Sequence, residues 1–121
     1  MKRLIKSFYN AFRGLGFVLR YEKNFQIHLV IGFLTLIGAY LLKFSHYDFI
    51  LILMIIVFVL VAELLNTIIE LLIDYINPNF NQRARLIKDV AAGTVLLMAI
   101  SAVIIGFFIF YPYLIRFFLK N

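Results

Sequence analysis

Apolar residues recur at helical spacing over the first twenty residues of the chain. They stand mostly three or four positions apart, at Leu4, Ile5, Phe8, Phe12, Leu15 and Leu19. The basic residues of this segment fall largely off the apolar stripe; they are Lys2, Lys6, Arg13 and Arg20. The pattern predicts an amphipathic helix over about 2–21, and a basic helix of this kind lies in the membrane interface without crossing the bilayer.

Three longer apolar segments follow, and each predicts a helix that crosses a bilayer. They cover about 27–43, about 49–75 and about 87–115. The first is short, because the sixteen residues from Ile27 to Leu42 reach about 24 Å at the rise of an α-helix. The third has no charge from Val90 to Ile115 and is long enough to span with tilt. Pro112 is expected to end or kink its last turn.

The composition indicates that these segments lie in lipid. Hydrophobic residues make up 64% of the 121 residues and charged residues 15%, and the mean hydropathy is +1.00. A soluble domain of this length has too little interior for so much apolar surface. The absence of cysteine excludes a disulfide framework and a thiolate zinc site. The expected fold class is an all-α integral membrane protein, one membrane domain over 1–121 with three transmembrane helices and an N-terminal amphipathic interfacial helix.

The basic residues are distributed unevenly between the predicted loops. Twelve Lys and Arg residues against six acids give a net charge of +6. Three spans place nine of the twelve beside the N-terminus and in the loop that ends at Lys88, and three on the other side: Lys43, Arg116 and Lys120. The positive-inside rule then predicts a multi-pass protein of the bacterial cytoplasmic membrane with its N-terminus in the cytoplasm. This bias accounts for the basic charge without a nucleic-acid partner.

Three of the six acids lie on one face of the second predicted span. Glu63, Glu70 and Asp74 are separated by seven and four residues, which places them within an arc of roughly 40° on a helix. Asn66 flanks the same stripe. Counted from Phe49 on the outer side, Glu63 lies about 21 Å along the helix, in a hydrocarbon core about 30 Å thick. The stripe therefore runs from the membrane interior to cytoplasmic water.

These acids also have a simpler interpretation, in which interfacial charges anchor helix ends. That interpretation suits Asp74 and, on the other side of the membrane, Asp48. It suits Glu63 and Asn66 poorly, because both lie too deep. An acid at the centre of a spanning helix costs about 2.5–3.5 kcal/mol on insertion scales, so a role in function is favoured for these two residues.

The residue types around the stripe are typical of phosphoryl transfer. Carboxylates and amide oxygens are hard ligands that suit Mg²⁺, which uses one or two carboxylates together with substrate phosphates. Glu22, Lys88 and Asp89 are predicted at the same cytoplasmic level as Glu70. Arg3 and Lys88 supply positive charge for an anionic reagent. A phosphoryl-transfer site needs these parts: a divalent metal, cations, a base and positioning groups.

The same residues carry a resemblance to a known family. The segment 62–70 reads AELLNTIIE, Asp74 follows it, the segment 87–93 reads IKDVAAG, and the segment 22–29 reads EKNFQIHL. Together they resemble the prokaryotic diacylglycerol kinase family. The segments 87–93 and 22–29 are closer in sequence to its undecaprenol kinase branch. The resemblance covers nearly the whole chain. It implies a homotrimer with active sites between protomers at the cytoplasmic interface, and transfer of the ATP γ-phosphate to a lipid hydroxyl with Mg²⁺.

The resemblance implies a role for each matching residue. Glu63 matches the general base that takes the proton from the lipid hydroxyl, and Asn66 matches a residue that holds the reacting groups. Glu22 and Glu70 match the metal ligands. The implied nucleotide-binding residues are Arg3, Asn10, Glu22, Glu70, Asp74, Asn79, Asn81, Lys88 and Asp89. The implied contacts to the lipid substrate are Arg3, Glu63 and Ala92.

The sequence departs from the family pattern at several positions. Gln26 stands where the family commonly has Arg, and Asn10 stands where the diacylglycerol branch has an aromatic residue. The loop 77–81 replaces a stretch that often carries Glu and His, so the contacts from Asn79 and Asn81 are the weakest assignments.

His28 and His46 lack a ligand partner in the sequence and are expected to snorkel to the interface. Small residues on one side of the third span predict helix packing; they are Ala92, Ala99, Ala102 and Gly106.

Three functions remain open from the residues alone. The first is a lipid kinase whose acceptor is undecaprenol or, as an alternative, diacylglycerol. The second is a small accessory subunit without enzymatic activity, whose acidic stripe pairs with basic residues of a partner. The third is an ion pathway through Glu63, which the apolar outer half of the second span disfavours.

Overall fold

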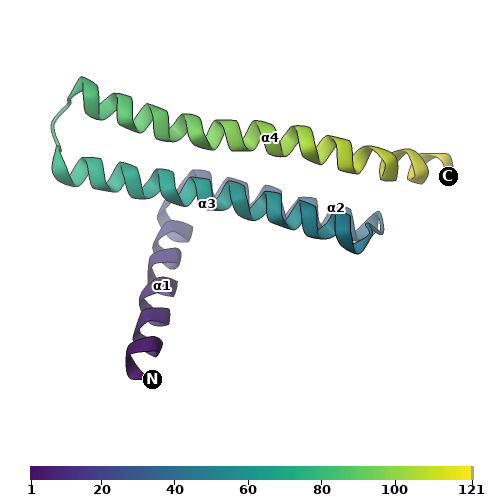
Figure 1. The fold of residues 1–121 in the computed structure, drawn as a ribbon, viewed down its shortest axis with the longest axis horizontal. Coiled ribbons are helices and arrows are strands. Elements are labelled where there is room, and N and C mark those ends of the chain that lie inside the picture. The colour runs from purple at the N-terminus through teal and green to yellow at the C-terminus, as the bar shows by residue number, and fades with distance from the viewer. Residues whose placement is uncertain (121) are drawn as a thin grey trace.

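The chain forms four helices joined by short connections. We describe a computed structural model, and it covers residues 1–120. The helices are α1 (Lys2–Tyr21), α2 (Lys23–Leu41), α3 (His46–Ile76) and α4 (Gln82–Lys120). Figure 1 shows α2, α3 and α4 side by side in one elongated bundle, whereas α1 projects away from it. Between residues 1 and 120 there is no β-strand, and the predicted all-α fold class is confirmed.

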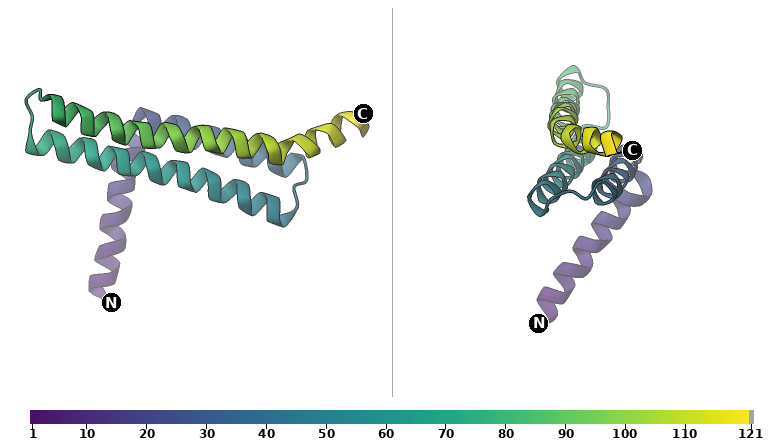
Figure 2. Two further views of the ribbon diagram at one scale, coloured as in Figure 1. Left: turned by 45° about the horizontal axis from the view of Figure 1, so that its top comes forward. Right: turned by 90° about the vertical axis from the view of Figure 1, so that its right-hand side faces the viewer.

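A single non-helical residue, Glu22, separates α1 from α2. Its backbone is extended, with φ −98° and ψ 105°. The Gln26 side chain stabilises this corner, because its Nε2 atom donates to the backbone oxygens of Leu19 at 2.8 Å and Arg20 at 3.2 Å. These are the carbonyl groups that the end of a helix leaves without partners. The corner directs α1 away from the bundle, as both views in Figure 2 show.

The turn between α2 and α3 contains an unusual backbone conformation. Lys43 has a φ of 58° and is the one non-glycine residue of positive φ between residues 1 and 120. The backbone N–H groups of Lys43 and Phe44 donate to the oxygens of Tyr40 and Ala39, as in a Schellman helix end, where glycine is the usual residue. The left-handed conformation costs roughly 1–2 kcal/mol for a residue with a side chain. Helix α2 ends at Leu41, directly before this turn.

Helix α3 lies at the centre of the bundle and packs against both α2 and α4. The backbone of α2 approaches α3 most closely at Gly32, where a Cβ atom would lie 2.7 Å from the Ile56 side chain. Helix α4 begins after Asn81, whose side-chain oxygen accepts hydrogen bonds from the backbone of Arg83 and Ala84. It continues through Pro112 to Lys120. Of the two predicted effects of Pro112, an end of the helix or a kink, the structure has the kink, and Figure 2 shows α4 bending near its yellow end.

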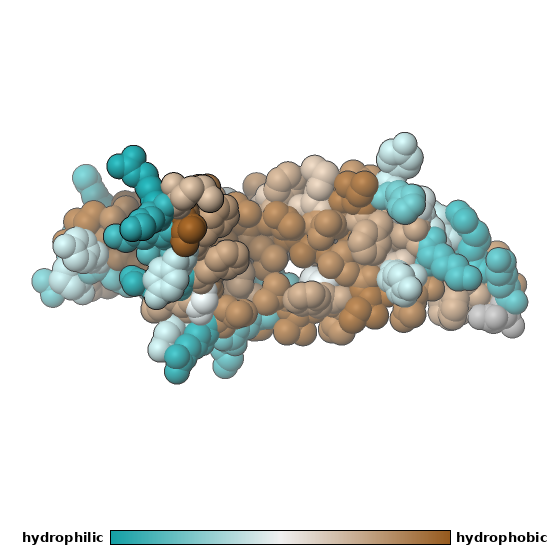
Figure 3. Space-filling model, turned by 90° about the horizontal axis from the view of Figure 1, so that it is seen from below, coloured by the Kyte–Doolittle hydropathy of each residue, from teal (hydrophilic) through white to brown (hydrophobic). Residues whose placement is uncertain are grey.

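The outer surface of the bundle is apolar in the middle and polar at both ends. Figure 3 shows this band as a brown belt between teal groups of hydrophilic side chains. Helices α2, α3 and α4 are each long and apolar enough to cross a membrane. This arrangement follows from the hydrophobic effect in a bilayer, because lipid-facing side chains need no covering by protein. The positions at which the bilayer surfaces cross these helices stay a prediction.

Candidate active site

Glu63 is buried between the helices of the bundle. It lies more than halfway along α3 and is 2% exposed. The next turn of α3 supports it, because the Thr67 hydroxyl, itself 1% exposed, donates to the Glu63 backbone oxygen at 3.0 Å. A carboxylate in such surroundings is costly unless a partner or a reaction requires it. Its burial excludes the interpretation that Glu63 merely anchors a helix end.

Asn66 and Glu70 continue the stripe one and two turns further along α3. The Asn66 Nδ2 atom donates to Glu70 Oε1 at 3.2 Å. The Asn66 side-chain oxygen is buried and has no hydrogen-bond partner within residues 1–120. Native proteins leave few buried polar atoms without a partner, and those that remain call for an explanation. The hydrogen bond fixes the amide so that its nitrogen faces Glu70 and its oxygen is free to contact a ligand.

Glu22 approaches the same site from the corner between α1 and α2. Glu22 immediately precedes α2, and His28, further along that helix, has its Nε2 atom 3.7 Å from Glu63 Oε2. Sequence spacing placed Glu63 and Glu70 on one helical face, and Glu22 is a further carboxylate at the corner before α2. The predicted gathering of acids at one end of the bundle stays a prediction.

The oxygen donors of this site are of the kind that a hard divalent cation prefers. Within residues 1–120, no three side chains of His, Asp or Glu already converge on one point at metal-binding distance. Two carboxylates are nevertheless enough for Mg²⁺ when water and substrate phosphate supply the other ligands. Glu70 and the unpartnered oxygen of Asn66 beside it are donors of this kind, and Glu22 is the second carboxylate that the resemblance assigns to the metal. The donor set fits Mg²⁺.

A second polar cluster lies where α3 and α4 are connected. The Lys88 ammonium on α4 contacts the Asp74 carboxylate on α3 directly. A cavity of about 260 Å³ adjoins this ion pair. Four predicted nucleotide-binding residues line it: Asp74, Asn79, Asn81 and Lys88. The fold thus brings together residues from a helix end, a loop and the next helix.

The remaining predicted site residues do not meet these clusters within one chain. Asp89 pairs with Arg85 on the exposed face of α4, with 3.3 Å between Nε and Oδ1. Ala92 is also exposed on α4. Arg3 lies near the free end of α1, remote from the bundle in Figure 1. Asn10 lines a cavity of about 760 Å³ between α1 and α3, on which Thr67 also borders.

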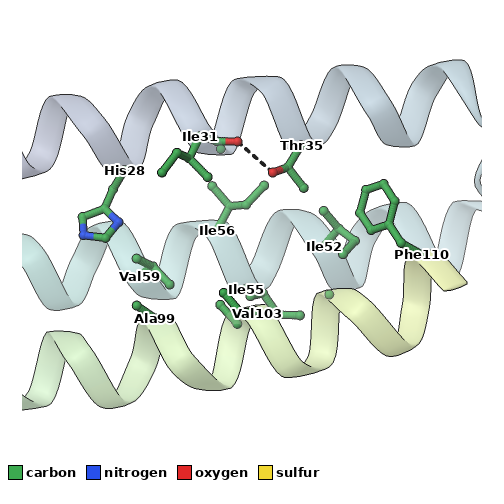
Figure 4. Close-up of a pocket in the computed structure, with 13 residues that line it drawn as sticks. His28, Ile31, Thr35, Ile52, Ile55, Ile56, Val59, Ala99, Val103 and Phe110 are labelled. Atoms are coloured by element: carbon green, nitrogen blue, oxygen red, sulfur yellow. Dashed lines mark hydrogen bonds between the residues drawn. The ribbon is translucent and has the colours of Figure 1, made fainter.

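His28 is a residue whose position the sequence did not reveal. Its Nε2 atom lies 3.7 Å from Glu63 Oε2, and Figure 4 shows its ring pointing from α2 towards α3. The prediction that His28 snorkels to the interface was wrong. The ring lines one end of an apolar cavity of about 330 Å³ between α2, α3 and α4. In the sequence, His28 stands six residues after Glu22, which corresponds to about 9 Å further along a helix. This spacing places His28 at a depth in the membrane near that of Glu63, and it is the signal that could have indicated their contact.

Comparisons with known proteins identify the family of the chain. A family model described as prokaryotic diacylglycerol kinase matches residues 9–110. The chain is 38% identical over 112 residues to the undecaprenol kinase of Bacillus subtilis (strain 168), across 93% of this chain and 91% of that protein. The chain belongs to the prokaryotic diacylglycerol kinase family. It is also 35% identical over 104 residues to the diacylglycerol kinase of Synechocystis sp., across 85% of this chain and 59% of that protein.

Membership of the prokaryotic diacylglycerol kinase family decides between the three open functions. The protein is a membrane lipid kinase, and the predictions of an accessory subunit and of an ion pathway are set aside. The matched range contains the residues of both polar clusters, from Glu22 to Lys88. Arg3 lies outside that range.

Proposed function

We propose that this kinase transfers the γ-phosphate of ATP to the hydroxyl group of undecaprenol at the cytoplasmic face of the bacterial cytoplasmic membrane. The observation that carries the proposal is the buried carboxylate of Glu63 next to further carboxylates in a lipid kinase of this family. The choice of acceptor is supported by the 38% identity to a protein named undecaprenol kinase. Diacylglycerol is the second candidate acceptor, supported by the relative of that name.

Glu63 is the general base in this proposal. A Glu63 carboxylate oxygen takes the proton of the lipid hydroxyl, and the hydroxyl oxygen forms a bond to the γ-phosphorus. The bond between the γ-phosphorus and the bridging oxygen breaks, and ADP leaves with that electron pair. General-base catalysis of this kind contributes about 10²–10⁴-fold in rate. The apolar cavity that ends at His28, beside the base, suits an acceptor whose chain is hydrocarbon.

Glu22 and Glu70 would hold Mg²⁺, with the Asn66 oxygen as a further donor. When bound, the ion neutralises charge on the transferring phosphate. Before binding, Asn66 and Glu70 are already ordered by their mutual hydrogen bond. Because these two side chains are already ordered, the site loses less conformational entropy when its ligands bind.

Lys88 is the proposed contact to the ATP phosphates, with Asp74 and the 77–81 loop around the nucleotide. Support comes from the cavity that these residues line together at the α3–α4 connection. We also propose a homotrimer, in which the N-terminal segment of one protomer completes the site of another. In support, Arg3 lies near the free end of α1, remote from the bundle of its own chain. The excess of basic residues near the N-terminus favours a cytoplasmic location for α1.

The choice of acceptor predicts the outcome of a direct competition. The protein, purified in detergent and supplied with Mg-ATP and equal amounts of undecaprenol and diacylglycerol, is expected to phosphorylate undecaprenol faster. The measurement is the amount of each phosphorylated lipid with time. Faster labelling of diacylglycerol would reverse the assignment of the acceptor, and labelling of neither lipid would contradict the proposed reaction.

His28 is expected to hold the Glu63 carboxylate in its reactive orientation. At 3.7 Å between Nε2 and Oε2 the ring restricts the carboxylate by contact, although the distance exceeds that of a hydrogen bond. His28→Ala should lower kcat by about tenfold, equivalent to about 1.4 kcal/mol, with little change in the KM for ATP. His28→Gln should recover part of the loss, because an amide N–H can donate to the carboxylate. Equal kcat values for the two variants would contradict this positioning role.

A further inference from the structure

A basic cavity lies at the end of the bundle opposite Glu70. Its volume is about 420 Å³, and its lining includes the three cations Lys43, Arg116 and Lys120. These are the three basic residues that the topology separates from the other nine. The positive-inside rule disfavours basic residues on this side of a membrane. Their convergence from the α2–α3 turn and the last turns of α4 therefore indicates a binding role.

The charge of this cavity is not balanced by the protein. None of the three cations forms an ion pair with a carboxylate in the part of the chain that the structure describes. Asp48 is the acid at this end, and its Oδ2 atom accepts a hydrogen bond from the Tyr113 hydroxyl at 2.5 Å. That hydroxyl also accepts from the Ser45 backbone N–H at 3.1 Å. The network is satisfied internally and leaves the cations available to an external anion.

One of the cations is held in place by an aromatic ring. The Arg116 guanidinium lies 5.3 Å from the centre of the Tyr113 ring, a cation–π distance. The opposite partner of that ring is Phe44, whose centroid lies 4.1 Å away in a stacked arrangement. The guanidinium is thus fixed at the edge of the cavity, next to the turn that carries Lys43.

The backbone of Lys43 supplies an independent observation. Its φ of 58° lies in the region that favours glycine, in a helix end where glycine would serve without strain. Cations interact favourably with the dipole at the C-terminal end of a helix, which explains why Arg116 and Lys120 lie near the end of α4. This effect does not explain a lysine in the strained position of the turn. Strained residues of this kind concentrate at ligand-binding sites.

We propose that this cavity binds the phosphate-bearing headgroup of an anionic phospholipid. Three cations match the negative charge of the headgroup. The apolar side chains of Leu41 and Phe117 in the same lining match the beginning of the acyl chains. The cavity also borders the apolar belt of the bundle, and Figure 3 shows hydrophilic side chains gathered at the end where α4 finishes. A lipid is favoured over a soluble phosphate because the lining combines both kinds of contact.

The test is native mass spectrometry of the whole protein in detergent with phosphatidylglycerol or phosphatidylcholine. The wild type should retain phosphatidylglycerol in preference to phosphatidylcholine. Each of Lys43→Gly, Arg116→Gln and Lys120→Gln should weaken retention of phosphatidylglycerol by about fivefold. Arg83→Gln, which removes one exposed positive charge at the opposite end, is the matched control and should retain the lipid like the wild type.

Lys43→Gly separates a binding role from a structural one. The substitution removes the charge and also relieves the positive φ, so its thermal midpoint should equal or exceed that of the wild type. Loss of lipid from a protein that is at least as stable supports the proposal. Retention equal to that of Arg83→Gln would overturn it, as would equal retention of the two lipids by the wild type. Displacement of phosphatidylglycerol by millimolar glycerol 1-phosphate would replace the lipid with a soluble phosphate as the ligand.

Discussion

Replacing Glu63 with glutamine is expected to abolish lipid phosphorylation while the protein stays folded. The amide has nearly the shape of the carboxylate but cannot accept the proton of the lipid hydroxyl. The expected fall in kcat is about 10²–10⁴-fold, the contribution of a general base. Because Glu63 is 2% exposed, a neutral side chain at this position should keep or raise stability in lipid. The measurement is single-turnover phosphorylation with Mg-ATP, together with the thermal midpoint of the variant.

Asp48→Asn is the matched control for this substitution. It also converts an acid into its amide, but at the end of the bundle remote from the carboxylates, where Asp48 bonds to Tyr113. Its turnover should equal that of the wild type. Full activity of Glu63→Gln would remove Glu63 from the mechanism, and a fold lost in that variant but kept in Asp48→Asn would indicate a structural role instead.

Replacing Glu70 is expected to weaken the binding of Mg²⁺ and to lower activity. Glu70→Ala removes a proposed ligand and the partner of the Asn66 amide, whereas Glu70→Gln keeps an oxygen that can accept from Asn66 and removes only the charge. Both variants should need a higher Mg²⁺ concentration for half-maximal activity. The increase should be at least the roughly 10–100-fold that loss of an outer-shell partner costs.

The two Glu70 variants distinguish the metal from the hydrogen bond. If the carboxylate binds the ion, Glu70→Gln should resemble Glu70→Ala in a titration with Mg²⁺. If the residue serves only to hold Asn66, Glu70→Gln should keep wild-type behaviour. An unchanged Mg²⁺ titration in both variants would contradict the assignment of Glu70 as a ligand.

Helical periodicity was sufficient to predict the four helices, but not the ends of all of them. The amphipathic stripe from Leu4 to Leu19 and the apolar segments have strong local signals, since lipid requires a continuous apolar helix. The positive φ of Lys43, a conformation typical of glycine, has no signal in the periodicity of the helix that precedes it. Helix α4 passes Pro112 because a bend lets a helix continue past the missing donor.

The candidate site was predictable where its residues share one helix. Spacing alone placed Glu63, Asn66 and Glu70 on one face. The contact between His28 and Glu63 joins residues 35 positions apart in the sequence, and it depends on how α2 rotates against α3. The hydrophobic periodicity of either helix does not determine that rotation. The close approach of α2 to α3 at Gly32 helps to set it. A lone histidine therefore had no recognisable partner before the fold was known.

The contact between Lys88 and Asp74 has a consequence for selectivity among anions. Before a nucleotide arrives, the ammonium is already neutralised by the carboxylate on the neighbouring helix. An incoming anion must compete with that carboxylate and separate the pair. A chloride ion carries one charge, so its attraction to Lys88 replaces little of the attraction lost when Lys88 and Asp74 separate. A triphosphate carries several charges and replaces the lost attraction. Under the proposed function, this contact would favour a polyphosphate over a monovalent anion at Lys88.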